Sequence, residues 1–545
     1  MNRLDEKIGI WLFVAIEHFE TKRAETLEMI LGFLFSSVFY AFVAFFLYLV
    51  YNYRKNYTYW TKSGLPYIPF PRDCVFFPRH KALTLQTFYN ELAPHPLGGF
   101  YKMSRPFLMI RDPKLIRLMT IKDFAHFTDR GLDVHEELDP LNLHIFRLEG
   151  SRWKTVRGKI TPAFSSARVK AMWPYLEQCE RMFEKYLDHH NETNGQIDVM
   201  EAFEKFTVDV IGTCVLGLEC SAIQSEDSAL RKTAHLILRP SNLHFLRSFL
   251  RSTGLKFISW LKWKKVFPAV DDFFFSIVRE TIKHRAENEA RRQDFMQHLI
   301  NIQQEELETL RKQENGQEPV LTEAMIAAQA FLFFVAGYES TAGTLAYCLH
   351  LLAQYPEMVE KCRLEVEEVV KQNGGTLTYE CLNDLTYLQS VIDETLRLYP
   401  PLGWLERICV IPYVVPDSSY IIKKGQRIII PIHAIHHNPQ YFPEPEKFDP
   451  DRFSKTNKSN IISGTYFPFG DGPRICAGMR FAFMVMKATL ASLLMSYDIE
   501  PSSKTKFSVE FERTMFLLVP KNGLWLKIKK RAVEEKSEDF KQKAL

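Results

Sequence analysis

The stretch that decides the fold is FPFGDGPRICAG, from Phe467 to Gly478 near the C-terminus. Glycines, a proline and Arg474 stand just ahead of a single cysteine, Cys476. A long apolar run, AGMRFAFMVMKATLASLLMSY, follows the cysteine and is typical of a buried helix. The cysteine is therefore expected at the N-terminus of that helix. Backbone N–H groups, the helix dipole and Arg474 would there favour the thiolate over the thiol.

A thiolate in this setting has three possible uses. It can be the axial ligand of a haem iron, which requires one sulfur held rigidly by backbone donors. It can be a nucleophile, although a nucleophilic cysteine needs a histidine partner and none is near in the sequence. It can also belong to an anion-binding loop. The glycines allow the backbone to approach a flat ligand closely, but the loop alone does not choose among the three.

Further motifs decide the matter. FGDGPRICAG, from Phe469 to Gly478, matches the F-x-x-G-x-R-x-C-x-G signature of the cytochrome P450 enzymes at all six fixed positions. Four shorter stretches resemble other motifs of that family: WKTVR (153–157), AGYEST (336–341), ETLR (394–397) and PDRF (450–453). The likeness covers about residues 60 to 530. Stretches such as DFAHFTDRG (123–131) are most similar to the insect microsomal family 6, which shares a clan with vertebrate family 3.

The resemblance implies a mainly α fold with small β-sheets and one molecule of haem b (heme b), whose iron Cys476 would bind. It also implies that Glu394 and Arg397 form a buried structural cluster with Arg452, which supports the cysteine loop. An isolated E-x-x-R pair would otherwise be a weak surface ion pair. The positions that match haem-binding residues of the family are Trp153, Arg157, Arg407, Phe469, Arg474 and Gly478.

The stretch FFVAGYESTAG is expected on a central helix. Taken alone, its small residues indicate close helix packing, with Ser340 and Thr341 bonded to their own helix. The resemblance implies instead that Ala336 and Gly337 leave room for dioxygen, and that Glu339 and Ser340 relay protons, with Thr341 as a further catalytic hydroxyl. Serine stands at 340 where the family usually has threonine, so a hydroxyl remains but the coupling of electrons to product is in question. The positions that match the substrate pocket are Leu332, Val335, Ala336, Leu402, Gly403, Leu405, Met515 and Phe516.

The activity that the resemblance implies is a monooxygenation. One atom of O2 would enter a lipophilic small molecule: a xenobiotic such as an insecticide or plant toxin, or an endogenous lipid or hormone. Electrons would come from NADPH through NADPH–cytochrome P450 reductase, with cytochrome b5 as a second donor. The alternatives are a reductase-independent haem-thiolate isomerase or dehydratase, and a non-catalytic membrane haem-binding protein. Five cations near the motifs would form a docking face for the reductase or be ordinary solvated charges: Arg152, Lys154, Lys159, Arg474 and Lys487.

The N-terminal region carries a membrane signal. Residues 29–51 contain no formal charge and are long enough to span a hydrocarbon core of about 30 Å. We therefore predict an N-terminal extension (1–28), a transmembrane anchor (29–51), a Pro-rich neck (52–72), the monooxygenase domain (73–530) and a polar tail (531–545). Translation starting at Met29 is an alternative. The resemblance and the cysteine pattern favour the endoplasmic reticulum membrane, with the catalytic domain in the cytosol.

Composition supports this organisation. The chain has 545 residues, 46% of them hydrophobic, and 43 phenylalanines, which indicates apolar surface facing lipid or a ligand. Nine cysteines without regular spacing favour a reducing compartment, with most of them as small core residues. The net charge of +4 gives no reason to expect a nucleic-acid partner.

The remaining patterns predict local structure. Helical periodicity dominates from about Pro113 to Tyr399. Short strands are expected at GGFYKM (98–103) and FLMIRDP (107–113), and YIIKKGQRIIIPI (420–432) reads as a hairpin turning at Lys424 and Gly425. The segment 241–267 mixes aromatic and basic residues, which suits either a shallow membrane contact or an amphipathic core helix.

Overall fold

A computed structural model of the protein describes residues 2–69, 79–102, 105–132, 134–193, 195–218, 222–225, 228–238, 266–287, 292–313, 318–513 and 516–531. Met515, most of the segment 241–267 and nearly all of the predicted polar tail lie outside these residues. The chain divides into two units, one of residues 1–65 with 104–106 and one of residues 66–103 with 107–545.

The first unit is built on one helix, α1 (Asn2–Thr61). Within it, the segment Glu28–Tyr48 is apolar and long enough to cross a membrane, and none of its hydrophobic window is buried. At about 1.5 Å per residue, 21 residues of helix cover about 30 Å. The helix also runs through the predicted extension and ten residues into the predicted neck. The membrane anchor remains a prediction.

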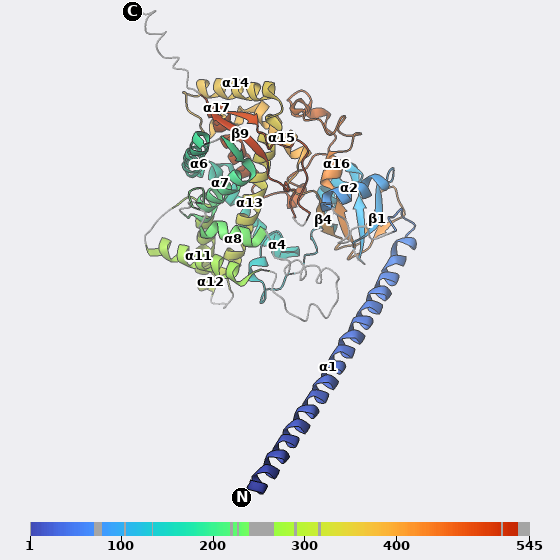
Figure 1. The fold of residues 1–545 in the computed structure, drawn as a ribbon. Coiled ribbons are helices and arrows are strands. Elements are labelled where there is room, and N and C mark those ends of the chain that lie inside the picture. Colours follow the sequence, from blue (N-terminus) through green and yellow to red (C-terminus); the bar gives the residue numbers. More distant parts are fainter. Residues whose placement is uncertain are drawn as a thin grey trace, which may run out of the picture. The chain divides into compact units, whose positions relative to one another are not determined.

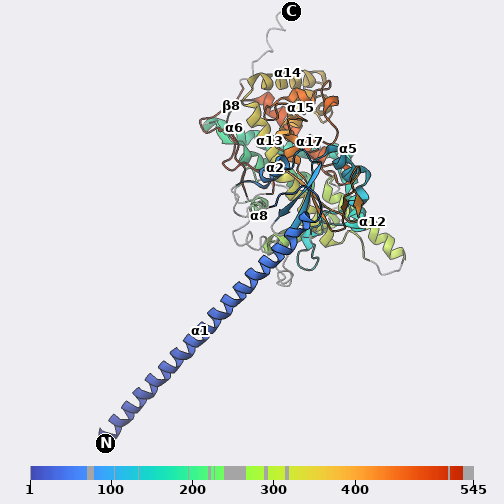
Figure 2. The same cartoon turned by 90° about the vertical axis from the view of Figure 1, so that its right-hand side faces the viewer.

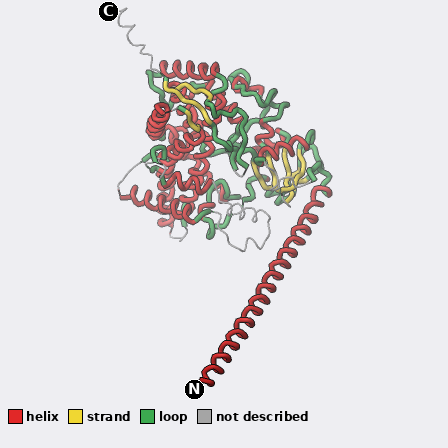
Figure 3. Tube along the Cα trace, in the orientation of Figure 1, coloured by secondary structure: helices red, strands yellow, loops and turns green. Residues whose placement is uncertain are grey.

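The second unit is mainly helical with small sheets, as expected (Figures 1 and 3). Its α-helices are α2 (Lys81–Glu91), α3 (Pro113–Arg117), α4 (Gly150–Ile160), α5 (Ser166–Ala171), α6 (Trp173–Thr193), α7 (Val199–Ile211), α8 (Ala229–Leu238), α11 (Pro268–Glu287), α12 (Phe295–Gln313), α13 (Glu323–Leu352), α14 (Pro356–Gln372), α15 (Thr386–Leu398), α16 (Ile432–His436) and α17 (Met479–Ser496). Short 3-10 or π turns are η1 (Leu118–Lys122), η2 (Phe124–His126), η3 (Pro140–Asn142), η4 (Thr161–Phe164), η5 (Gly212–Leu216), η6 (Glu380–Asn383), η7 (Pro450–Phe453), η8 (Lys458–Asn460) and η9 (Gly472–Arg474).

The strands form separate small sheets, seen in yellow in Figure 3. One sheet has the order β1-β2-β7-β4, in which β2 and β7 are parallel and Phe107 lies opposite Arg427. A second has the order β3-β9-β8, and β5 pairs with β6. The strands are β1 (Leu97–Lys102), β2 (Arg105–Ile110), β3 (Gln196–Asp198), β4 (Leu405–Ile408), β5 (Tyr413–Val414), β6 (Ile421–Ile422), β7 (Arg427–Ile430), β8 (Tyr497–Pro501) and β9 (Trp525–Lys530). The two strands predicted near residue 100 are thereby confirmed.

The predicted hairpin at Lys424 and Gly425 is wrong. β6 pairs with the preceding strand, β5, and Val414 lies opposite Ile421. β7 pairs instead with β2 and β4. The glycine still makes a turn, at φ 86°, and its N–H donates to the Cys409 carbonyl. Both flanking runs are rich in isoleucine, so local pattern alone cannot tell which partner each one takes.

The centre of the helical region is α13, which packs against α7, α11, α15 and α17. In Figures 1 and 2 α13, α15 and α17 lie side by side. The Thr322 side chain caps α13 by accepting from the Met325 N–H. α13 and α17 are apolar enough to cross a membrane, but most of each is buried within this unit, so we assign them to the core.

A buried ion pair joins α15 to the chain that leads to the cysteine loop. Arg397 donates from Nε and Nη2 to the two carboxylate oxygens of Glu394 at 2.7 and 2.8 Å, and neither side chain is exposed. Arg452, on η7, approaches the same carboxylate at 3.4 Å. Arg397 also donates to the His436 carbonyl at 2.9 Å. The Phe467 N–H in turn donates to Nε2 of His436 at 3.2 Å, so the pair is connected to the start of the cysteine loop.

Three buried histidines lie at this connection, and one of them, His436, is part of it. His433 and His437 stack with their ring centroids 4.1 Å apart, and His436 lies between them in sequence. Burial lowers the pKa of all three, that of His437 to about 4. In the unfolded chain a histidine titrates near 6.5. The stabilisation that comes from keeping these rings neutral is therefore complete above about pH 6.5 and is lost as the pH falls toward 4.

We therefore expect acid to destabilise this region. Lowering the pH from 6.5 to 5 should cost about 2 kcal/mol in the free energy of unfolding for His437, whose pKa is about 4 in the folded protein, and His433 and His436 should add to this cost. His437→Gln should remove about one histidine's share of that pH dependence. Denaturant titrations of detergent-solubilised protein between pH 5 and 8 measure it, with the exposed His95→Gln as the control. Equal slopes for wild type and His437→Gln would contradict the assignment.

Candidate active site

The cysteine loop takes its shape from close backbone contacts. The Cys476 N–H donates to the Phe469 carbonyl at 3.0 Å, which closes the loop on itself. Gly472 has a φ of 67°, and a Cβ there would overlap the Thr120 carbonyl, so only glycine fits. Gly478 is the N-cap of α17. Cys476 therefore sits just ahead of a helix N-terminus, as expected.

We infer that the Cys476 side chain faces a hollow enclosed by protein. By surface area its side chain is exposed, yet burial is the main cause that raises the pKa of its thiol. Both observations hold when a sulfur is reachable by solvent but surrounded by protein on most sides. Arg130 shows the same combination: it is partly accessible, and burial is the main cause that lowers its pKa well below the ordinary value. The two side chains line a hollow inside the protein.

A backbone N–H favours the thiolate, as expected, but the cations that do so are Arg157 and Arg130 in place of Arg474. The backbone N–H of Gly478 and the guanidinium groups of Arg157 and Arg130 oppose the effect of burial on the pKa of Cys476. Arg474 is engaged elsewhere: it donates to the carbonyls of Thr128, Ile145 and Leu148, at 2.9 to 3.0 Å. The net pKa of the thiol is still raised, so the structure alone does not ionise it. Binding of a metal cation deprotonates a thiol outright.

Four arginines gather around this hollow: Arg130, Arg157, Arg407 and Arg474. Arg407, Arg474 and Arg157 each lower the pKa of Arg130, as like charges at close range do. Within the described part of the chain, the one carboxylate at ion-pair distance from any of the four is Asp129, 3.8 Å from Arg474. Nε of the buried Arg407 has no hydrogen-bond partner there either. The cluster has an excess of positive charge that suits a ligand with two carboxylates.

The other predicted haem-binding residues lie around these arginines. The Arg474 guanidinium stacks over the Trp153 ring at 3.9 Å. Arg157 donates to the Ile475 carbonyl at 2.9 Å, which ties α4 to the cysteine loop. Phe469 packs against Phe483 of α17, with ring centroids 5.1 Å apart. Trp153 and Arg474 thus support the loop from within the protein, whereas Arg157 and Arg407 keep donor groups for a ligand.

One face of α13 is open. Leu332, Val335, Ala336 and Ser340 are all at least partly accessible, although most of this helix is buried. Leu332, Ala336 and Ser340 follow one another at intervals of four residues, and Val335 lies three after Leu332, so the four side chains share one side of the helix. Gly337 serves the packing between helices, because a Cβ there would lie 2.5 Å from the Ile211 side chain of α7. The small residues of this stretch therefore serve both purposes, an open face and a close helix contact.

The predicted proton-relay residues differ in their surroundings. The Ser340 hydroxyl donates to the Ala336 carbonyl of its own helix at 2.6 Å. Its oxygen keeps lone pairs and can accept a hydrogen bond from water or a bound group. Glu339 and Thr341 are both buried, at 4% and 6% exposure. Ser340 is thus the member of the three that lies on the open face.

The remaining predicted pocket residues lie in the segment that follows α15, which leads into β4, and in the segment 516–519. Leu402 is half-buried and Leu405 is buried, while Phe516 is 52% exposed. The Phe516 ring meets Trp404 edge-on at 5.4 Å and Phe146 at 6.5 Å. These aromatic contacts hold the 516–519 segment beside the residues that follow α15. Phe146 and Trp404 were not predicted from the sequence.

Gln329 links α13 to the arginine cluster. Its amide donates to the Leu143 carbonyl at 3.0 Å and accepts from the Ile145 N–H at 3.1 Å. The Ile145 carbonyl in turn accepts from Arg474. One polar side chain thereby fixes the distance between the central helix and the cysteine loop.

Comparisons with known proteins agree with this geometry. The family model for cytochrome P450 matches residues 65–526. Probable cytochrome P450 6a14 of Drosophila melanogaster is 34% identical over 489 residues, covering 87% of this chain and 96% of that protein. Cytochrome P450 6a2 of the same species is 33% identical, covering 90% and 99%. Cytochrome P450 9e2 of Blattella germanica is 33% identical, covering 82% and 88%.

The chain belongs to the cytochrome P450 family. It is therefore an oxidoreductase of the monooxygenase class that uses dioxygen, an organic substrate and a redox partner. Its cofactor is haem b, whose iron takes a cysteine thiolate ligand. The residues present fit that group: an enclosed thiol, four arginines with one carboxylate, and the unpartnered Nε of Arg407.

Sequence reasoning missed Arg130. It stands in the stretch DFAHFTDRG, which carried the family likeness, but no short motif marked its role. The fold brings it to the cluster, where its guanidinium stacks on Phe146 at 4.2 Å and donates to the Phe146 carbonyl at 3.0 Å. The signal that could have found it is an arginine directly after Asp129, whose carboxylate faces Arg474.

We predict that Arg130 contributes to cofactor retention. Arg130→Gln removes one charge-assisted contact to the cofactor, which is worth about 1.5–3 kcal/mol, so haem should dissociate at least about tenfold faster. Haem transfer to an apo-acceptor protein measures the rate. Lys122→Gln, an exposed neighbour in sequence, is the control. An unchanged dissociation rate for Arg130→Gln would show that the remaining arginines suffice.

Proposed function

We propose that the protein is an endoplasmic reticulum monooxygenase that oxidises lipophilic small molecules with electrons from NADPH–cytochrome P450 reductase. Xenobiotics such as insecticides or plant toxins, and endogenous lipids or hormones, are the substrates we expect. The observation that carries the proposal is the enclosed thiol of Cys476 among four arginines.

The balance of the reaction sets what the protein must do. Per turnover, the substrate, O2, two electrons and two protons yield the hydroxylated product and water. Haem supplies the oxygen activation when it is bound. Cys476 holds the cofactor from the side of α17, and Arg130, Arg157 and Arg407 hold its carboxylates. The open face of α13 positions the substrate, and Ser340 and Glu339 handle the protons.

A lipophilic substrate is supported by the side chains on the open face. Leu332, Val335 and Ala336 are apolar and accessible on α13, and Phe516 exposes an aromatic ring beside Trp404. Apolar walls of this kind gain binding free energy by removing apolar surface from water, without selecting one functional group. The proposal therefore names a class of substrate and no single compound.

A membrane location is supported by the apolar segment Glu28–Tyr48 of α1. A lipophilic substrate partitions into lipid, so an anchored enzyme meets it at high local concentration. The resemblance to microsomal enzymes favours the endoplasmic reticulum, where we place the catalytic domain on the cytosolic side.

The proposed reductase contact is a basic face beside the cysteine loop. Lys122, Lys154 and Arg480 are exposed, and in the described part of the chain none has a carboxylate at ion-pair distance. They lie on η1, α4 and α17, all of which adjoin the loop. Arg152 is exposed but pairs with Glu136. Cytochrome b5, the second donor, would use the same face.

Three cations in the predicted docking set are not free to take part. Arg474 is buried and bonded to backbone carbonyls. Lys487 is buried and donates to the Leu382 carbonyl at 2.7 Å. Lys159 pairs with Glu306 at 2.6 Å. Of the predicted set, Arg152 and Lys154 therefore remain, and the structure adds Lys122 and Arg480, which were not predicted from the sequence.

Replacing the thiol tests the proposed function directly. Cys476→Ser should abolish both the carbon monoxide difference spectrum of a thiolate-ligated haem and NADPH-dependent oxygen uptake, because a serine hydroxyl is a far weaker donor. Spectra and oxygen-electrode traces of the reductase-reconstituted enzyme provide the measurement. Turnover of a lipophilic panel at the wild-type rate by this variant would refute the assignment.

Charge reversal tests the docking face. Lys154→Glu combined with Arg480→Glu should raise the KM for reductase about fivefold at low ionic strength, and the difference should shrink as salt is added. The carbon monoxide spectrum should stay as in the wild type. Lys506→Glu, an exposed cation after β8, serves as the matched control. A salt-independent effect, or an equal effect of the control, would contradict a docking role.

A further inference from the structure

The backbone just before Arg130 is tied to its neighbours in the arginine cluster. The Thr128 carbonyl accepts a hydrogen bond from Nε of Arg474 at 2.9 Å. The Asp129 carbonyl accepts one from the Ile408 N–H at 2.9 Å, and Ile408 lies on β4, the strand that carries a third arginine of the cluster. Two of the three other arginines are thus linked to the residues that precede Arg130.

A reciprocal pair of hydrogen bonds ties the same segment to the start of α4, the helix that carries Arg157. The Asp129 carboxylate accepts from the Gly150 N–H at 2.9 Å. The Glu149 carboxylate accepts from the Gly131 N–H, also at 2.9 Å. The two carboxylates thus act in opposite directions, and together they close the base of the loop that runs from Gly131 to Glu149.

Both donors of this pair are glycines with a positive φ, 68° at Gly131 and 55° at Gly150. Glycine adopts this conformation readily, and other residues do so at a cost. Burial, and then the nearby Asp129 carboxylate, raise the pKa of Glu149 above its ordinary value, and the hydrogen bond from Gly131 opposes them. The surroundings as a whole disfavour an ionised carboxylate here, so what Glu149 contributes is the hydrogen bond.

We infer that Glu149 is a positioning residue for the haem: by closing the base of the loop it holds Arg130 where its guanidinium can bind a cofactor carboxylate together with Arg157. Arg130 lies between Asp129 and Gly131, the two residues bonded to the start of α4, so its backbone is held beside that helix. The inference rests on Arg130 contributing to cofactor retention, and it goes beyond the reaction proposed above.

Glu149 is a cleaner target for substitution than Asp129. The Asp129 carboxylate also lies 3.8 Å from Arg474 and accepts from the Thr128 hydroxyl, so replacing it would disturb more than the loop. Among the described residues, no cation lies at ion-pair distance from Glu149, which is exposed. A change at this position therefore removes the closing hydrogen bond with little else.

A double-mutant cycle tests the inference. Glu149→Ala should speed haem transfer to an apo-acceptor protein about threefold, because losing one hydrogen bond at the base of the loop loosens Arg130. In an Arg130→Gln background the same substitution should have no further effect, since the group that it positions is gone. A role in general stability would instead multiply the two effects.

Two further variants separate the hydrogen bond from the charge and from the loop as a whole. Glu149→Gln keeps an oxygen that can accept from the Gly131 N–H, so its transfer rate should equal that of the wild type. Glu137→Ala removes another exposed glutamate of the same loop and should also leave the rate unchanged. Melting temperatures of the haem-loaded variants show that each one is folded.

The outcomes are distinct. Multiplying effects of Glu149→Ala and Arg130→Gln would overturn the inference, as would a wild-type rate for either single variant. If Glu149→Gln loses haem as fast as Glu149→Ala, the charge and not the hydrogen bond matters, and the inference is overturned as well. The proposed function is decided separately, by the carbon monoxide spectrum and the NADPH-dependent oxygen uptake of the wild type.

Discussion

The fold of the catalytic unit depends on one buried ion pair, Glu394 with Arg397. Neither side chain reaches solvent, so losing either partner would leave a desolvated charge at a cost of about 3–5 kcal/mol. The pair does more than stabilise α15. Through the His436 carbonyl and ring it reaches the Phe467 N–H, the first residue of the cysteine loop. The position of the Cys476 thiol is therefore set by a charge interaction about eighty residues earlier in the chain.

Arg474, within the cysteine loop, holds the loop in place by donating hydrogen bonds to three backbone carbonyls. One of these, Ile145, is bonded to Gln329 of α13, so the loop and the central helix share a support. What remains around the hollow is Arg130, Arg157 and Arg407 with little opposing charge. Burial, and then like-charge repulsion from the other arginines, lowers the pKa of Arg130, and the repulsion persists until a dianionic ligand balances it. The positive charge of this arginine cluster is thus balanced only when the two carboxylates of the cofactor are bound.

Much of this was predictable from local patterns, and the exceptions share a cause. The cysteine loop, the α15 pair, the mainly helical fold and the two strands near residue 100 follow from motifs or periodicity within about ten residues. The pairing of β7, the partners of Arg474, the burial of Lys487 and the role of Arg130 all depend on contacts with distant segments. Sequence spacing carries no information about such contacts, whereas a short motif carries the geometry of its own turn.

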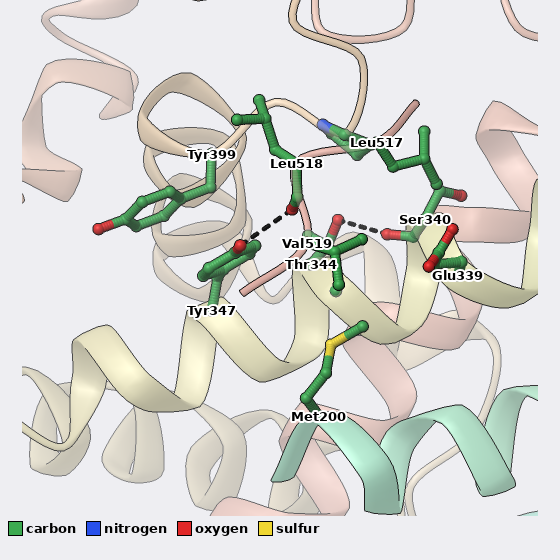
Figure 4. A pocket seen from close by; sticks show the side chains of 11 residues that line it. Met200, Glu339, Ser340, Thr344, Tyr347, Tyr399, Leu517, Leu518 and Val519 are labelled. Carbon is green, nitrogen blue, oxygen red and sulfur yellow. Dashed lines mark hydrogen bonds between the residues drawn. The ribbon is translucent and has the colours of Figure 1, made fainter. Parts of the chain in front are cut away.

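Helix α13 shows why a proton-handling site constrains a core helix. A fully packed helix would fill both the open face at Ala336 and the space beside Gly343, since interiors tolerate few voids. Two glycines within two turns of this helix have opposite effects on packing. Gly337 lets α7 approach closely, whereas Gly343 leaves space that no neighbour occupies. Glu339 lies between them on the same helix and is buried. It lines a small cavity (Figure 4) that Gly343 also lines, and the open face of α13 begins at the neighbouring Ser340. A carboxylate that must take and release protons needs polar neighbours, because burying a charge without them is too costly.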